Sequence, residues 1–589
     1  MGGPFTPDDR TAPIGRRVRR RWILGGVLAV VGLWVAVCAV TLLSAAHQLQ
    51  GGVTAASAVR GEVTTQDLAD NRAARDLTNA VSRFGSAHDL LNAPWLAPLR
   101  IVPYVGRQLR SAQALSGAAN TVAHAGAQTL GQAHDLLTAP HATPAERAGL
   151  VRRLAAAVST LDRRTAPVDL GPAQALLPVL AAKRATFAGD LAKLRTSLDR
   201  GSGATAALAD LLTGPRTYLV LAANNAEMRD GSGMFLEAGT VTATDGALSF
   251  SAFIPTGALY NPDPTVPLTG DLQRLWGQFT PNQEWRNLSL SPQFPVNAAL
   301  AAQMWQTQMS QKVDGVLAID VDGLRAILGA TGPQSSGGQT ISVDNVEQVL
   351  LKDQYAGLSA SGDDRNAARH EELGVLAASV LGAVQQPGVS LAGLGSGIAG
   401  AGTGRHLLAW AGDPRIEADW TAAGVGGQVD RSGILLGLAN TGANKLDPYQ
   451  QITTTLSTTR AGANTKIKVT AKIANQAPPE LSDYVAAGDD PSLARGTYVG
   501  VATLDVPKAA GDLRVDRPGV TAQGSDYTSD VVAVPVTIPP GQTTVVTWTF
   551  SLAGSSGRLV VEPSARIPAT RWDAQGRAFT DAAPRTVAW

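Results

Sequence analysis

The residues best suited to bind a ligand follow Tyr218–Ala222, a short apolar run typical of a buried strand. They are Asn224, Asn225, Glu227 and Arg229. Polar loops after buried strands bind ligands in open α/β sheets, and the fork of an arginine can hold a phosphate or carboxylate. We therefore predict an anion site here. An equally open alternative is that Asn and Glu satisfy backbone groups of a tight loop, while Arg229 pairs with Glu227 or Asp230.

A second candidate site contains Arg365 and Arg369, which are four residues apart and would share one face of a helix. Asp363 and Asp364 would lie near the start of that helix, where negative charge is favourable. These arginines could bind an anion. The commoner explanation for such a pattern is a solvated, charged first turn.

Other polar patterns are weaker. Asp320 and Asp322 could hold a cation, although we favour Asp322 as the cap of the helix that follows. Gly395–Gly400 matches the letters of a dinucleotide-binding fingerprint, but no clear strand precedes it, and we interpret it as a flexible loop. The histidines lack paired spacing and Cys38 is the sole cysteine, so we predict no metal and no cofactor. We find no complete catalytic signature.

Composition limits the classes of function. The chain has 589 residues and a formal net charge of +1, with 16% charged residues. A nearly neutral chain is a poor candidate for binding nucleic acid, because phosphate backbones require a basic surface. The length predicts several domains.

One N-terminal segment is long and apolar enough to cross a membrane. Trp22–Ala46 has 25 residues without a charge and follows a basic tail, residues 1–21. Arginines next to a first span stay in the cytoplasm, so we predict that the rest of the chain is extracytoplasmic at a cell membrane. The alternative is a cleaved signal peptide, but signal cores are shorter. The first predicted partner is therefore the lipid bilayer, through residues 22–46.

Residues 47–214 are predicted to form an extracytoplasmic helical stalk. Apolar residues recur at helical spacing, as in Leu77, Val81, Phe84 and Leu91. Residues 92–106 interrupt the pattern and predict a corner between helices. His88 lies on the apolar stripe, and we interpret it as a partly buried structural histidine. The stalk is a spacer or, alternatively, a bundle that binds partner proteins.

Residues 215–450 are predicted to form an α/β domain. Asp245-Gly246 between two strand-like runs predicts a hairpin, and the apolar run Val316–Ile319 precedes a helical pattern.

Residues 451–589 are predicted to form an all-β sandwich of immunoglobulin type. Apolar residues alternate with polar ones around Ile467–Ile473 and Val546–Leu552, and Pro539–Gln542 marks a turn between strands.

Three separated motifs resemble a bacterial membrane-anchored family, the domain-of-unknown-function 4012 family. They are Asn224–Arg229, Val313–Asp320 and Asn440–Asp447. The likeness covers roughly residues 90–589, and the name of that family implies no activity.

The central domain also resembles the LytR-CpsA-Psr family in the order of its elements: a strand, a polar Gly loop, a hairpin, a helix opening at Val296–Ala299, and the segments Ile319–Leu324 and Asp364–Arg369. That resemblance implies an anchored transferase that moves glycopolymers from polyprenyl pyrophosphate carriers to the wall. Arginines and an aspartate would hold the pyrophosphate, with a divalent metal. The chain departs from that pattern at Thr256-Gly257, Gly231–Met234 and Gln354–Gly357, which lack the expected charged residues.

The sequence as a whole therefore predicts a multidomain protein: a single transmembrane helix, a helical stalk, a LytR-CpsA-Psr-like α/β (α+β) domain and an immunoglobulin-like sandwich. We expect non-catalytic binding of an anionic or glycan-linked envelope component, such as a polyprenyl phosphate or a wall glycan. The alternatives are a glycopolymer transferase with a rearranged site, and a scaffold or sensor that binds proteins through the stalk.

Overall fold

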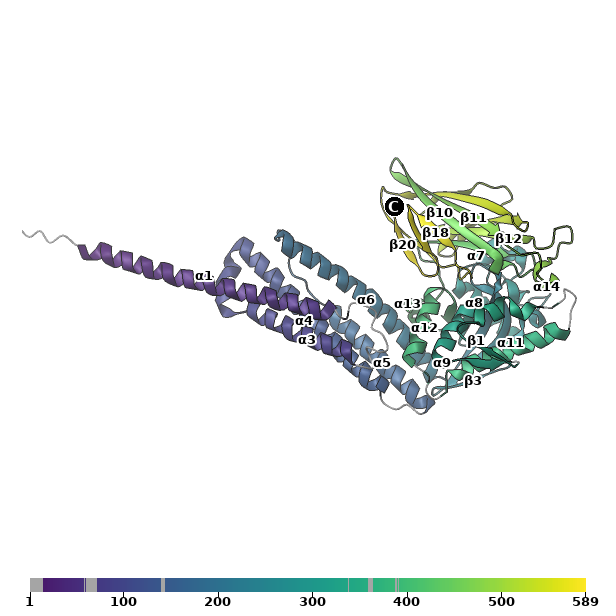
Figure 1. Ribbon diagram of the computed structural model, residues 1–589, viewed down its shortest axis with the longest axis horizontal. Coiled ribbons are helices and arrows are strands. Elements are labelled where there is room, and N and C mark those ends of the chain that lie inside the picture. The colour runs from purple at the N-terminus through teal and green to yellow at the C-terminus, as the bar shows by residue number, and fades with distance from the viewer. Residues whose placement is uncertain are drawn as a thin grey trace, which may run out of the picture. The chain divides into compact units, whose positions relative to one another are not determined.

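The computed structural model describes residues 14–57, 59, 71–138, 143–336, 338–356, 358, 364–386, 389 and 391–589 (Figure 1). The chain divides into two compact units. The first contains Met1–Ala139 and Ala156–Leu198, and the second contains Pro140–Ala155 and Asp199–Trp589. Two helices, α5 (Pro144–Thr165) and α6 (Pro178–Thr213), contribute residues to both units.

The first unit is helical. It contains α1 (Ile14–Ser57), α3 (Arg72–Leu91), the 3₁₀ helix η1 (Pro94–Ile101) and α4 (Pro103–Thr138). On α3, Phe84 and Leu91 of the predicted stripe are buried and Leu77 and Val81 are half-buried, which confirms the amphipathic pattern. The predicted corner is also confirmed, since η1 joins α3 to α4. His88 is half-buried and its Nδ1 lies 3.2 Å from the Ser116 hydroxyl, as expected of a structural histidine.

Among the described residues, one helix is long and apolar enough to cross a membrane. The qualifying stretch is Leu28–Ser57 of α1, with a mean hydropathy of 2.4. The prediction of an apolar N-terminal helix is therefore confirmed. Helix α1 continues without interruption to Ser57, so the predicted border between span and stalk at residue 47 lies inside one helix.

The second unit begins with a mixed six-stranded sheet in the order β3-β2-β1-β5-β8, with β4 paired to β2. The strands are β1 (Arg216–Met228), β2 (Gly233–Thr244), β3 (Ala247–Phe250), β4 (Ile254–Pro255), β5 (Gly315–Ile319) and β8 (Leu407–Ala411). Only β1 and β5 run parallel within this sheet. The predicted hairpin is confirmed: Asp245 and Gly246, with φ of 49° and 82°, form the two-residue turn between β2 and β3.

Helices cover both faces of this sheet because alternate residues of β1 point to opposite sides. Leu219 and Leu221 pack in one core with residues of α7 (Gly270–Trp276) and α8 (Phe294–Met309). Tyr218 and Val220 pack in the other. That second core includes residues of α9 (Val321–Thr331), α10 (Val346–Leu351) and α11 (Asp364–Ala383). The layered α/β arrangement is therefore as predicted (Figure 1).

One glycine-rich segment differs from its prediction. Gly395–Gly400 lies within a helix, α12 (Leu391–Thr403), and is not a loop. Small residues let α12 approach α9 closely, since a Cβ at Gly397 would lie 2.9 Å from the Ala326 carbonyl oxygen. Burial of Leu394 in the same core supplies stability that the helix propensity of glycine does not. Two small elements complete this region, the hairpin of β6 (Gln334–Ser336) with β7 (Gln339–Ile341), and α13 (Pro414–Ala422).

The C-terminal part consists of two six-stranded sheets that share a core. The first contains β13 (Gly511–Val515), β16 (Thr543–Ala553), β11 (Asn464–Asn475), β10 (Gln450–Ala461), β18 (Arg571–Ala574) and β19 (Arg577–Thr580). The second contains β14 (Ala522–Asp526), β15 (Ser529–Ile538), β12 (Tyr498–Pro507), β9 (Gly433–Asn440), β17 (Arg558–Val561) and β20 (Arg585–Ala588). The one-turn helix α14 (Asp483–Ala486) lies between β11 and β12 in the chain.

The predicted two-residue period is confirmed in this region. Ile467, Val469, Ala471 and Ile473 of β11 are buried while the lysines between them are exposed. The predicted domain boundary at residue 450 is wrong, however. Strand β9 ends at Asn440 and pairs with β12 and β17 of the second sheet. Its residues are buried throughout, so the apolar run does not show which sheet it joins.

Candidate functional site

The segment predicted as a polar ligand loop is part of a strand. Asn224–Met228 belongs to β1, which pairs irregularly with β2 between Asn224 and Met228. Asn224, Asn225, Glu227 and Arg229 are all buried. The loop prediction is wrong because these polar side chains find partners inside the fold, which allows the strand to continue beneath other elements.

Three segments distant in sequence meet around this part of β1. Asn225 Nδ2 donates to Asp320 Oδ2 at 2.8 Å, which joins β1 to the end of β5. Lys445 Nζ lies 3.1 Å from Glu227 Oε2, and Met228 N donates to Asp447 Oδ2 at 3.0 Å. The motifs at residues 224–229, 313–320 and 440–447 therefore form one polar junction.

Asp447 occupies the centre of this junction. Its carboxylate accepts hydrogen bonds from Asn440 Nδ2 at 2.9 Å, Tyr498 Oη at 3.1 Å and Arg566 Nη1 at 2.9 Å. Burial alone would lower the pKa of Arg566, but the charge of Asp447 outweighs it and raises that pKa. Arg566 and Asp447 therefore form a buried ion pair in which each charge depends on the other.

Arg229 is also held internally. Its Nη1 donates to the carbonyl oxygens of Met228 at 3.0 Å and Asn440 at 2.5 Å, and its Nη2 donates to Asn287 Oδ1 at 3.2 Å. Burial lowers its pKa, against the charges of Glu227 and Asp447. Arg229 thus fixes β1 against β9 through hydrogen bonds from both of its Nη atoms.

Arg369 packs on tyrosine side chains next to Asn224, the first residue of the predicted anion site. Its guanidinium lies 5.4 Å from the ring centre of Tyr355 and 5.9 Å from that of Tyr484. Tyr355 Oη accepts a hydrogen bond from Asn224 Nδ2 at 2.9 Å, and Lys445 lies over the Tyr484 ring. The structure therefore links Arg369 to Asn224 through Tyr355, while the Nη donors of Arg229 point to Asn287 and Asn440.

The other residues predicted from the sequence lie on α1 and α11 or at the start of α9. Arg365 belongs to α11, as expected, but its side chain lies outside the described residues. Trp22 likewise belongs to α1 without a described side chain, and Ala46 lies within the same helix. The prediction that Asp322 caps the helix is wrong. Asp320 is the N-cap of α9 and accepts from the backbone N–H groups of Asp322 and Gly323.

Asp320 and Asp322 together hold a histidine that the sequence analysis did not select. His406 Nδ1 lies 2.7 Å from Asp320 Oδ2, and His406 Nε2 lies 3.4 Å from Asp322 Oδ2. Burial alone would lower the pKa of His406, but the two carboxylates raise it overall. Because both ring nitrogens face carboxylates, the charged imidazolium form is stabilised relative to a free imidazole.

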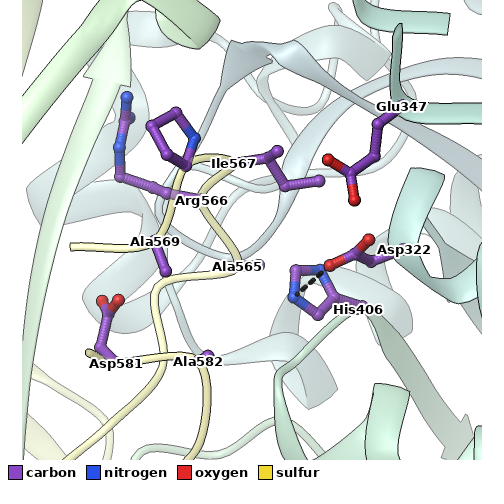
Figure 2. Close-up of a pocket in the computed structure, with 10 residues that line it drawn as sticks. Asp322, Glu347, His406, Ala565, Arg566, Ile567, Ala569, Asp581 and Ala582 are labelled. Carbon is purple, nitrogen blue, oxygen red and sulfur yellow. Dashed lines mark ion pairs between the residues drawn. The ribbon is translucent and has the colours of Figure 1, made fainter. Parts of the chain in front are cut away.

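His406 and Asp322 line a pocket of about 200 Å³ (Figure 2). Figure 2 shows His406, Asp322 and Glu347 on one side and the loop Ala565–Ala569 with Asp581 on the other. The lining combines three carboxylic acids, the imidazole and Arg566 with apolar atoms of Ile567, Pro568 and alanines. It therefore offers mostly hydrogen-bond acceptors next to an apolar wall.

Charges in the pocket are partly compensated. Arg325 pairs with Asp322, at 3.1 Å, and with Glu347. Burial raises the pKa of Asp581 to about 6, although Ser564 and the Thr570 N–H donate to it. Among the described residues, no group of three or more His, Cys, Asp or Glu side chains is arranged to hold a metal ion.

Two of the important residues carried no local signal in the sequence. His406 is 86 residues from Asp320, and Arg566 is 119 residues from Asp447. Asp447 was present in a resembling motif, although its role was not identified.

Comparison with known families supports part of the resemblance. Residues 213–355 match the model of a family described as "Protein of unknown function (DUF4012)". The match spans β1, β2, β5 and α9, and so includes Asn224–Arg229 and Asp320. The chain matches no curated protein and no solved structure.

Proposed function

We propose that the chain is a single-span cell-envelope protein that binds a glycan-linked envelope component in the pocket beside His406, without catalysing its transfer. The observation that carries this proposal is the lining of that pocket. Asp322 and Glu347 are acceptors for hydroxyl groups, and Ile567 with Pro568 gives an apolar wall for the C–H face of a sugar ring.

The excess of carboxylic acids favours a sugar over a phosphate. A phosphate brought next to Asp322 and Glu347 would face like charge, which costs binding energy. Arg566 is the arginine in the lining, and its Nη1 already donates to Asp447. Of the two classes expected from the sequence, the glycan part of an envelope component fits this lining better than the anionic part.

The size of the pocket limits the ligand. Its volume of about 200 Å³ is below the ~300–1,000 Å³ of most sites for small molecules. We therefore propose that it accepts one sugar residue or a chain end.

The hydrogen-bond partners of His406 and Arg229 fit a binding role without catalysis. A general base needs a free lone pair, but both nitrogens of His406 face carboxylates within 3.4 Å. Arg229, which the transferase alternative would use, donates to carbonyl oxygens inside the fold. These contacts favour binding over glycopolymer transfer.

The finer fold assignments are part of the same proposal. The layered sheet, with parallel β1 and β5 and a helix opening at Phe294, supports a LytR-CpsA-Psr-like domain. The two packed sheets of mostly antiparallel strands support an immunoglobulin-like sandwich.

The topology can be tested in cells. We propose that the N-terminus is cytoplasmic and that the chain after α1 is outside, because arginines precede the apolar stretch. Protease added to intact cells should then remove the C-terminal sheets. Digestion only after the membrane is ruptured would contradict this orientation.

The ligand can be tested by calorimetry on the full chain in detergent, titrated with wall disaccharide–peptide fragments and, separately, with polyprenyl phosphate. We expect the fragments to bind and Asp322→Asn or Glu347→Gln to weaken binding about tenfold, the equivalent of one lost hydrogen bond. Asp512→Asn is the matched control, since Asp512 is exposed on β13. The proposal fails if no fragment binds, or if the pocket variants bind as tightly as the control.

A further inference from the structure

An exposed apolar surface lies next to α1 in the first unit. It consists of η1 and the first turn of α4, residues 94–105, which we name the wedge. Trp95 is 45% exposed, Ile101 84% and Tyr104 52%, and Val102 and Val105 are also exposed. Arg100 is the single charge in these twelve residues. A contiguous apolar surface of this kind usually contacts another apolar phase.

The wedge is fixed to the apolar part of α1. Trp34 Nε1 donates to the Trp95 carbonyl oxygen at 2.9 Å, and Trp95 Nε1 donates to Thr41 Oγ1 at 3.0 Å. Leu96 and Cys38 are buried in the same small core. The wedge therefore lies alongside residues 34–41 of α1, within the predicted span of residues 22–46.

This attachment sets the depth of the wedge. The helix rises 1.5 Å per residue, so the 19 steps from Trp22 to Thr41 cover about 29 Å. The hydrocarbon layer is about 30 Å thick, so a span that enters at Trp22, as predicted, reaches the far boundary at Thr41. Trp34 lies roughly 10 Å before Thr41, so the wedge must lie at the level of the last ~10 Å of the lipid leaflet.

The backbone of the wedge suits a lipid environment. An unpaired N–H group is costly in lipid, and Pro94, Pro98 and Pro103 have none. The Val102 N–H donates to the Leu99 carbonyl oxygen within the segment, and at its ends Leu96 N–H donates to Ala93 and Gly106 N–H to Val102. The Trp95 carbonyl oxygen accepts the hydrogen bond from Trp34 Nε1. Trp and Tyr at its surface are the side chains that favour the boundary between lipid and water.

We propose that residues 94–105 insert into the lipid leaflet beside α1, as a second membrane contact of the chain. This inference rests on the proposed span by α1. Trp95 and Ile101 would contact acyl chains and Tyr104 the headgroup region, while the exposed Arg100 would lie near lipid phosphates. Together, α1 and the wedge would hold the helical unit at a fixed depth and rotation in the membrane. A single helix alone would leave it free to rotate and to change depth.

The experiment uses the full chain with Cys38→Ala, reconstituted in phosphatidylcholine–phosphatidylglycerol vesicles. Single cysteines carrying an environment-sensitive fluorophore are placed at Ile101 in the wedge, at Leu33 in α1, and at Ser82 on the exposed side of α3 as the matched control. Quenching is measured with nitroxide-labelled lipids and with aqueous iodide. We expect labels at positions 101 and 33 to lose fluorescence to the lipid quencher, and the label at position 82 to iodide.

Other quenching patterns would contradict parts of this proposal. If lipid quenches position 33 while iodide quenches position 101, α1 spans the membrane and the wedge inference is wrong. If neither agent quenches position 101, protein covers the wedge and the lipid assignment is overturned. If lipid fails to quench position 33, the proposed span itself fails. Circular dichroism of each labelled protein checks that its helices are intact.

Discussion

The polar junction around Asp447 and the pocket beside His406 share structural elements but differ in their access to solvent. In the junction, Asp447 receives donors from Asn440, Tyr498 and Arg566, and all four side chains are buried. In the pocket, Asp322 and Glu347 border open space and pair with the exposed Arg325. The segments that form the junction are rich in polar residues, whereas the pocket is the region that a ligand can enter.

This difference has a physical origin. A buried polar group must find a partner within the protein, so motifs rich in Asn, Asp and Arg are needed wherever several elements meet in a core. A pocket instead needs acceptors that remain partly available. Polar density in a sequence is therefore evidence for a junction as much as for a site, and four predictions separate the two regions.

The largest expected effect is at Asp447. Asp447→Asn leaves the Arg566 charge without its counterion inside the protein, which typically costs about 3–5 kcal/mol of unfolding free energy. Urea unfolding of the full chain, followed by tryptophan fluorescence, measures the loss. The double variant Asp447→Leu with Arg566→Met should be less destabilised than Asp447→Asn. A loss below about 1 kcal/mol for the single variant would contradict the role of the ion pair.

A smaller effect is expected at Asn225, whose amide bonds to Asp320, to the Ala565 carbonyl and to the Val321 N–H. Asn225→Ala leaves these buried groups short of a partner and should cost about 2–3 kcal/mol. The same unfolding assay applies, with the exposed Asn464→Ala as control. Equal stability of the two variants would show that the junction tolerates loss of a member.

Stability should fall as pH rises from 5 to 8. Burial raises the pKa of Asp230 to about 7, against a hydrogen bond from Thr503. The pKa of Asp230 is therefore higher in the folded than in the unfolded protein. At a pH below its unfolded pKa, Asp230 contributes fully to the unfolding free energy. That contribution is lost as the pH rises through about 7. The raised pKa of His406 acts in the same direction, above about pH 6.5.

We expect the unfolding free energy to drop by about 2 kcal/mol or more over this pH range. Asp230→Asn should make the profile less steep, since the raised pKa values of Asp581 and His406 remain, and the exposed Asp512→Asn should leave it unchanged. A profile that rises with pH, or one that Asp230→Asn leaves unaltered, would contradict the assignment.

The smallest effect on stability is expected in the pocket. The side chain of Asp322 is 19% exposed and its partner Arg325 is more exposed still, so Asp322→Asn should change the unfolding free energy by no more than about 1 kcal/mol. Its effect on glycan binding should nevertheless be about tenfold. A strongly destabilised Asp322→Asn would place Asp322 with the junction and remove the contrast between the two regions.

Local patterns in the sequence determined much of the architecture. The apolar stretch of α1, the Asp245-Gly246 hairpin and the alternating residues of β11 each depend on neighbours within a few positions, so periodicity and turn chemistry predicted them. The order of the helical, α/β and β-sheet regions follows from the same patterns.

Only the tertiary structure decided which polar residues face a ligand and which face the core. Asn225 meets Asp320 across 95 positions and Arg566 meets Asp447 across 119, separations over which no local pattern operates. The same limit explains β9, whose continuous apolar run suits either sheet, and α12, which is helical because it packs on α9. A side chain has the same donors and acceptors wherever it lies, but its burial and its partners arise only when distant segments pack together.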